Sequence, residues 1–162
     1  MPAVVGRVLP WAGLLARLVV GGVWIAAGSL KLPDPAASVR AVRAYRLLPE
    51  ATVHAVGYGL PALEIVIGLL LVVGLGTRIV ATISAVLLTL FIFGISSALA
   101  RGLQIDCGCF GGGGYAADAT SKYPTEIARD IGLMLGSVLL VVFPRTKASL
   151  DGWLLPDVRS AS

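Results

Sequence analysis

Apolar residues fall into four long stretches of the chain, and each stretch is a candidate for a membrane-spanning helix. A helix needs about 20 mostly apolar residues to cross a hydrocarbon core about 30 Å thick. The stretches cover about residues 11–30, 53–74, 79–99 and 127–143, and the third of them holds no charged residue. This pattern predicts an all-α fold, in which a polytopic membrane protein is built as a bundle of four transmembrane helices.

The connections between these stretches differ in length. Only a short segment, Gly74 to Arg78, separates the second and third stretches, which predicts a tight turn between antiparallel neighbouring helices. Residues 31–52 form a longer connection, and four apolar residues in it predict one face of a short helix lying in the membrane interface: Val39, Val42, Leu47 and Leu48. We expect one membrane domain over residues 1–148 and a short polar tail over 149–162.

Composition supports a membrane protein. The chain is 57% hydrophobic and 14% charged, whereas soluble proteins average roughly 45–50% and about 25%. The net charge of +4 is typical of basic loops in such proteins. A nucleic-acid partner would require a basic stripe with stacking aromatic residues, which the sequence lacks. We therefore expect the lipid bilayer as a partner, and no nucleic acid.

The only two cysteines, Cys107 and Cys109, stand one residue apart in the last long connection, beside four glycines at 111–114. Their Cα atoms are close enough for a disulfide. The ring so formed is tight, and strain makes a disulfide easier to reduce. We interpret the two cysteines as a catalytic redox pair for thiol exchange, while a structural disulfide and half of a metal site remain open alternatives.

A metal site is the weakest of these interpretations. Structural zinc takes four ligands, and the cysteines would have to be joined by His54, the only histidine, and Asp106. No spacing of ligands in the sequence supports this set, so we expect no metal.

Two ionisable residues, Arg17 and Glu64, lie inside predicted spanning stretches. A charge within a membrane is costly and usually has a partner or a function. At about 1.5 Å per residue, Arg17 lies about 9 Å from one membrane face and Glu64 about 15 Å from the same face. This predicts a structural intramembrane charge pair between them; the alternative is a proton-carrying carboxylate at Glu64.

The residues of the first and second stretches resemble the signature of the DoxX-like membrane proteins. The matching residues are Arg17, Gly21-Gly22, Ala27-Gly28-Ser29-Leu30-Lys31-Leu32, Asp34-Pro35, Pro61, Glu64 and Gly68. The segment Cys107-Gly108-Cys109-Phe110-Gly111 resembles the MauE branch, the methylamine-utilisation proteins. The resemblance covers roughly Arg17 to Phe143, and it implies a four-helix membrane protein associated with redox or disulfide metabolism, alongside a thioredoxin-like partner.

The sequence departs from the disulfide-generating quinone reductases of similar topology, which carry a second cysteine pair and a CxxC motif. One dithiol supplies two electrons but no route for them across a membrane. A complete electron carrier would therefore need a partner, a quinone or a bound cofactor. No cofactor is evident in the sequence, and nothing in it supports a quinone in particular.

We expect a multi-pass protein of the cell membrane whose Cys-Gly-Cys loop exchanges disulfides with a thioredoxin-like protein and supports maturation of exported proteins. The alternative is a non-catalytic membrane subunit or anchor of a redox complex, with a structural disulfide. Lysine and arginine do not orient the chain, because five lie on one predicted side and six on the other. Disulfides persist outside the reducing cytosol, which places the cysteine loop on the extracytoplasmic side.

Overall fold

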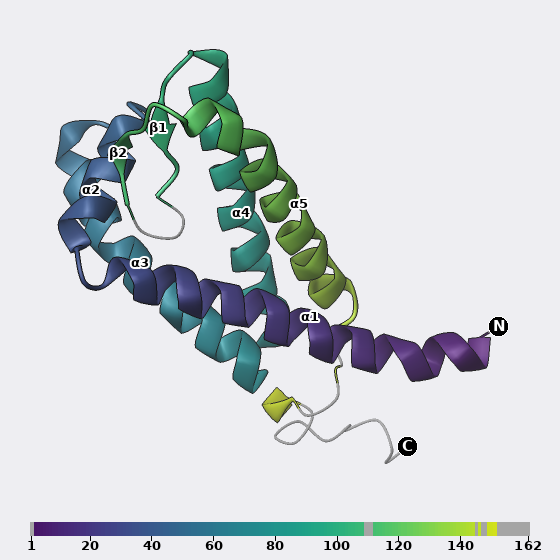
Figure 1. The fold of residues 1–162 in the computed structure, drawn as a ribbon. Helices are drawn as coiled ribbons and strands as arrows, with labels where there is room; N and C mark the ends of the chain where they lie inside the picture. The colour runs from purple at the N-terminus through teal and green to yellow at the C-terminus, as the bar shows by residue number, and fades with distance from the viewer. Residues whose placement is uncertain (1, 109–111, 145, 147–148, 152–162) are drawn as a thin grey trace.

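The computed structural model describes residues 2–108, 112–144, 146 and 149–151 of the chain. Within these residues the fold is mostly helical, with one short β-hairpin (Figure 1). The elements, in chain order, are α1 (Pro2–Lys31), α2 (Pro35–Ala44), α3 (Glu50–Val73), α4 (Thr77–Ala100), β1 (Ile105–Asp106), β2 (Gly114–Tyr115) and α5 (Ala119–Val142). Residues 152–162 of the expected polar tail lie outside the described residues.

The long helices associate as two pairs. α1 packs along α3, and α4 packs along α5 (Figure 1). The predicted tight turn joins α3 to α4: Gly74 has φ +76° and donates its N–H to the Leu70 carbonyl at 2.8 Å, which ends α3. Beyond this turn the two helices diverge (Figure 1). The sequence predicts that α3 and α4 are close neighbours. In the structure they meet only near the turn and form the two sides of a wedge (Figure 1).

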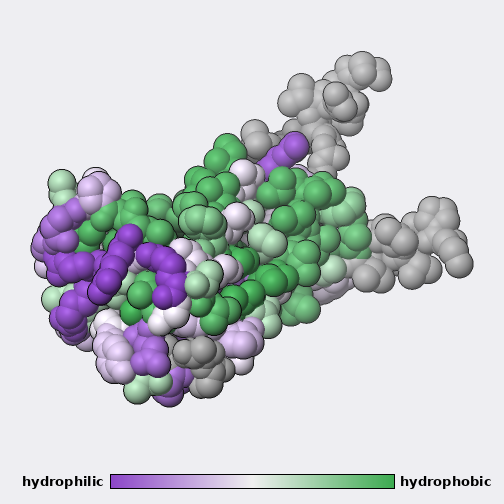
Figure 2. Space-filling model, turned by 90° about the horizontal axis from the view of Figure 1, so that it is seen from above, coloured by the Kyte–Doolittle hydropathy of each residue, from purple (hydrophilic) through white to green (hydrophobic). Residues whose placement is uncertain are grey.

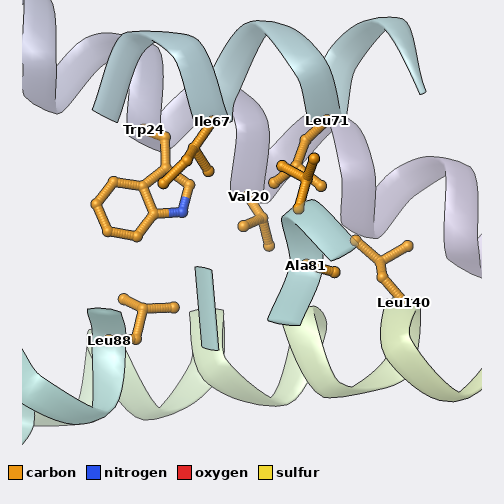
Figure 3. Packing of buried hydrophobic residues seen from close by; sticks show 8 residues of the cluster. Val20, Trp24, Ile67, Leu71, Ala81, Leu88 and Leu140 are labelled. Carbon is orange, nitrogen blue, oxygen red and sulfur yellow. The ribbon is translucent and has the colours of Figure 1, made fainter. Parts of the chain in front are cut away.

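The core lies where the two pairs meet, near the narrow end of the wedge. Figure 3 shows apolar side chains from α1, α3, α4 and α5 around this core, and the buried ones are Val20, Trp24, Ile67, Leu71, Val80, Ala81, Leu88 and Leu140. A short polar chain crosses it, because the Trp24 indole N–H donates to Ser84 Oγ at 2.7 Å and Ser84 Oγ lies 2.9 Å from Ser137 Oγ. These bonds link α1, α4 and α5, and they give both the Ser84 and the Ser137 hydroxyl a partner.

Among the described residues, three helices are long and apolar enough to cross a membrane: Leu9–Lys31, Glu50–Val73 and Thr77–Ala100. They establish the chain as a multi-pass, all-α membrane protein. The expected fourth span is not confirmed by this criterion. α5 is as long as α3 and α4, but Glu126, Arg129 and Asp130 interrupt its apolar sequence.

The surface agrees with a membrane environment. Figure 2 shows hydrophilic residues gathered at the end of the molecule that carries α2, and apolar residues over much of the rest of this face. Many large apolar side chains are exposed, among them Leu15, Ile79, Phe93 and Leu135. A soluble protein rarely exposes so much contiguous apolar surface, whereas lipid accommodates it.

The predicted short helix in the connection after α1 is α2, but its environment differs from the expectation. Asp34 caps it by accepting the Ala37 N–H at 3.0 Å, and Pro35 occupies its first turn. Val39 is buried against α3, where a Cβ added to Gly57 would fall 2.7 Å from the Val39 Cα. Leu47 and Leu48 lie beyond the end of α2 and are exposed. α2 is thus packed on α3, and its apolar face does not include those two leucines.

Candidate functional site

The cysteine loop begins directly after β1 at the polar end of the molecule. β1 and β2 pair antiparallel, with Ile105 opposite Tyr115. The buried Tyr123 hydroxyl, from the first part of α5, accepts the Ile105 N–H at 3.1 Å and lies 2.7 Å from the Leu103 carbonyl oxygen. Tyr123 therefore fixes the entry to the loop against α5.

Cys107 itself is half-buried, and its backbone is held from α2. The Tyr45 hydroxyl donates to the Cys107 carbonyl at 3.2 Å, and the Gly108 N–H donates to Asp106 Oδ1 at 2.9 Å. Gly108 has φ +68°, a conformation that glycine adopts readily and that other residues disfavour. Cys109, the second member of the predicted redox pair, lies outside the described residues, so the pair itself stays a prediction.

Two cations near the cysteine loop in the sequence, Arg101 and Lys122, are engaged by other groups. Arg101 donates to the Tyr45 carbonyl at 2.6 Å, and Lys122 pairs with Asp118 at 2.8 Å. The hydrogen bond from Lys122 holds the pKa of the Asp118 carboxyl below its usual value. The charge of Lys122 is thus offset by Asp118, whereas Arg101 is held by a neutral carbonyl.

Glu64 forms a buried ion pair, but with a residue other than the predicted one. Its Oε1 accepts from Lys31 Nζ at 2.5 Å, and the two side chains are only 0% and 4% exposed. The other carboxylate oxygen, Oε2, has no hydrogen-bond partner among the described residues. The predicted Arg17–Glu64 pair is wrong, because Lys31 at the end of α1 occupies the position beside Glu64.

Arg17 is satisfied by the end of a helix rather than by a carboxylate. Its guanidinium, 1% exposed, donates to the carbonyls of Leu71 and Val72 at 2.8 and 2.9 Å, and to Thr146 Oγ1 at 2.6 Å. The last carbonyls of a helix have no partner within the helix and carry partial negative charge. Arg17 therefore caps the C-terminus of α3 and ties it to the segment after α5.

A second contact at the same end comes from Asp151. Its carboxylate oxygens accept the N–H groups of Gly76 and Thr77, both at 2.8 Å, at the start of α4. Partial burial raises the pKa of the Asp151 carboxyl, but the lowering effects, which include these backbone hydrogen bonds and the positive charge of Arg17, together bring the pKa below its usual value. Asp151 supplies the cap that Gly76, which has no side chain, cannot supply.

A cavity of about 350 Å³ lies between α2, α3 and α4, next to the cysteine loop. Apolar side chains line most of it, and Lys31, Ser38, Tyr45 and Cys107 contribute its polar part. The sequence reasoning missed Ser38, Tyr45 and Tyr123. No pattern in the sequence marks them, because they meet the loop only through the packing of α2 and α5.

Among the described residues, no three side chains of His, Cys, Asp and Glu converge in the manner of a metal site. His54 lies on the exposed start of α3, where its Nε2 is 3.7 Å from Glu50 Oε1 and its ring stacks near Tyr58. Glu50 also accepts a hydrogen bond from Arg43 Nε at 3.0 Å. This cluster is a surface ion-pair group at the start of α3.

The comparisons with known proteins identify a family. The family model described as methylamine utilisation protein MauE matches residues 9–143, which include α2, α3, α4, the cysteine loop and α5. No curated protein and no solved structure matches the chain.

Proposed function

The chain belongs to the family of the methylamine utilisation protein MauE, and we propose that its Cys107–Cys109 pair exchanges disulfides with a thioredoxin-like protein at the membrane surface. In this function the chain supports the oxidative maturation of exported proteins. The family match and the three apolar helices make it a multi-pass membrane protein. The proposal concerns what the cysteine loop does.

One observation carries the proposal: Cys107 lies outside the spanning helices, on a loop supported from two sides. Tyr45 holds its carbonyl, and Tyr123 holds the preceding strand against α5. A loop so placed presents a thiol to a protein in the aqueous phase. A strained two-cysteine ring in such a loop favours exchange over stapling.

The exchange balances without a further reactant. A thiolate of the pair attacks the disulfide of the thioredoxin-like protein, or the partner's thiolate attacks the Cys107–Cys109 disulfide, and a mixed disulfide forms. The remaining cysteine of the attacked pair then leaves as a thiolate. The second thiol of the attacking pair resolves the mixed disulfide, so that one protein is oxidised and the other reduced by two electrons.

Trapping of the mixed disulfide tests the proposal. With Cys107→Ser or Cys109→Ser, the resolving thiol is missing, and we expect one of the two variants to accumulate a covalent adduct with a thioredoxin-fold protein. The adduct should disappear on reduction. The double variant is the matched control, since it has no thiol to form an adduct.

The same variants test the alternative of a membrane anchor with a structural disulfide. In that case neither single variant forms an adduct with a thioredoxin-fold protein. The double variant then loses thermal stability while its association with other membrane subunits is retained. That outcome would overturn the exchange proposal.

A further inference from the structure

The cavity beside the cysteine loop is lined by residues of α2, α3 and α4. Its apolar walls come from α3 and α4, which diverge from the turn at Gly74 (Figure 1). Its volume, about 350 Å³, falls within the range of about 300–1,000 Å³ that is common for small-molecule sites. The apolar lining residues include Val56, Leu60, Leu87, Leu90, Phe91 and Phe93.

Two polar groups in the cavity have unused hydrogen-bonding capacity. Ser38 is 3% exposed, and its Oγ has no hydrogen-bond partner among the described residues. Lys31 is 4% exposed and, within the described part of the chain, gives one hydrogen bond, to Glu64, although an ammonium group has three N–H donors. Buried polar groups left unpaired are costly. Both residues line the cavity, so a ligand there that accepts hydrogen bonds would satisfy them.

The charge of the site limits which acceptor fits. The charge of Lys31 is offset by Glu64, so this end of the cavity offers hydrogen-bond donors without net positive charge. A lipid phosphate would bring a net negative charge that nothing here neutralises. A neutral carbonyl oxygen on a flat apolar body matches both the donors and the walls.

We infer that this cavity binds the ring of a membrane-soluble quinone, with a ring carbonyl at Ser38 and Lys31, and that the quinone is the electron acceptor of the cysteine loop. The inference rests on the proposed thiol–disulfide function, and it supplies the electron acceptor that a single cysteine pair needs. Cys107 lines the same cavity. The apolar tail of a quinone would lie between α3 and α4, whose outer faces carry many exposed apolar side chains.

The redox step is balanced. The two thiols of the Cys107–Cys109 pair lose two electrons and two protons as the S–S bond forms. The quinone gains the two electrons and two protons and becomes the hydroquinone. The step needs no other oxidant or reductant, and it regenerates the disulfide that the thioredoxin-like partner consumes.

Binding and turnover can be measured separately in phosphatidylcholine nanodiscs with a short-chain benzoquinone as the probe. Calorimetric titration of the Cys107→Ser/Cys109→Ser protein gives the affinity without reaction. Ultraviolet absorbance then follows hydroquinone formation by the pre-reduced wild-type protein. We expect saturable binding, and about one hydroquinone per protein in a single turnover.

Two variants, made in the cysteine-free protein, locate the binding site. Ser38→Val removes the unpaired hydroxyl and should weaken quinone binding about tenfold, without lowering the melting temperature. Leu60→Trp places a large ring in the cavity and should weaken binding at least as much. Leu63→Trp is the matched control, since Leu63 is exposed on α3 away from the cavity lining, and it should bind the quinone as the parent protein does.

Distinct outcomes separate this inference from the proposed function. Equal affinity of Ser38→Val and the parent protein, or equal affinity of Leu60→Trp and Leu63→Trp, would overturn the cavity site and leave lipid as its occupant. Binding without hydroquinone formation would overturn the redox step. Either result can occur while the mixed disulfide with a thioredoxin-fold protein still forms, and in that case the proposed function stands and the quinone does not.

Discussion

Buried charges in this protein are satisfied in two different ways. Arg17 donates to carbonyls at the end of α3, where the helix has acceptors to spare. Glu64 lies in the middle of its helix, where the backbone carbonyls and N–H groups are already paired, so it needs a cation from another element. Lys31 provides it from the last turn of α1, because side chains of a helix lean toward its N-terminus and so back over the bundle.

A double-mutant cycle at Lys31 and Glu64 measures this pairing. Lys31→Met or Glu64→Leu alone leaves one buried charge unpaired, and each should cost about 3–5 kcal/mol of unfolding free energy. The double variant should cost much less than the sum, because neither charge remains. Thermal unfolding in detergent micelles gives the three differences.

The Arg17/Glu64 cycle is the matched control. Arg17→Leu and Glu64→Leu should be additive, because the two side chains have separate partners. Strong coupling between Arg17 and Glu64, together with additivity between Lys31 and Glu64, would contradict the structure. That result would support the Arg17–Glu64 pair that the sequence predicts from the depth of both residues in the membrane.

The observed partners of Arg17 and Glu64 show how far the sequence predicts the role of a single residue. The sequence identifies Arg17 and Glu64 as the ionisable residues of two apolar stretches, and both are buried. Their partners depend on how far α1 is shifted along α3. Gly21 lies beside Gly68 and Leu71, which places Arg17 level with the end of α3 and about two turns beyond Glu64. The stretch boundaries read from hydropathy were too coarse to fix this register.

At the scale of elements, small residues set the contact between α1 and α3. A Cβ added to Gly68 would lie 2.6 Å from the Gly21 carbonyl oxygen, and one added to Gly28 would lie 2.7 Å from the Pro61 carbonyl oxygen. These contacts allow the two helix backbones to approach closely, as is common in membranes. By contrast, Gly22 and Gly132 have no atom near an added Cβ, so spacing alone does not identify the glycines at a contact.

Alanine substitutions distinguish contact glycines from the others. Gly68→Ala should destabilise the protein by about 1–3 kcal/mol, because the added methyl meets backbone that can move only if α1 and α3 separate. Gly59→Ala, in the same helix, should be neutral or slightly stabilising, because its Cβ would enter open space. Thermal unfolding of the two variants makes the comparison, and equal effects would show that α1 and α3 do not pack as described.

α5 shows why the number of spans differs between sequence and structure. Its charged residues fall in the half that leads out of the cysteine loop, and Asp130 there is 2% exposed and pairs with Arg129 at 2.8 Å. A hydropathy average counts such residues against a span, although the Asp130 carboxylate is buried and the Arg129 side chain is 28% exposed. We propose that α5 crosses the membrane beside α4, with the Asp130 carboxylate inside the bundle.

At the scale of the whole molecule, the arrangement of the pairs creates the cavity. The tight turn at Gly74 suggests two helices in contact, but α3 packs on α1 and α4 packs on α5, and the space between α3 and α4 widens toward α2 and the hairpin (Figure 1). The sequence predicts the helices and the cysteine motif. It does not predict the cavity, because Ser38, Tyr45 and Phe91 meet only through the divergence of the two pairs.

The cysteine loop and the turn between α3 and α4 lie in different parts of the molecule. Cys107 is held by Tyr45 at the end of α2, while Arg17 and Asp151 contact the turn residues Gly74 and Gly76. We propose that the hydrophilic end is extracytoplasmic, because a strained disulfide would not persist in the reducing cytosol. The basic residues of α2, Arg40 and Arg43, oppose this placement: they pair with Asp34 and Glu50, but acidic residues weigh little in orientation.

Labelling of whole cells with a membrane-impermeant maleimide tests this orientation, since Cys107 and Cys109 are the only cysteines of the chain. We expect labelling only after mild reduction, as for an external, oxidised pair. The matched control is Arg78→Cys in the Cys107→Ser/Cys109→Ser background. Arg78 is exposed at the start of α4, at the opposite end, so this variant should label only after the membrane is permeabilised. The reverse pattern would place the cysteine loop in the cytoplasm, where the disulfide would be reduced and oxidative maturation of exported proteins could not proceed.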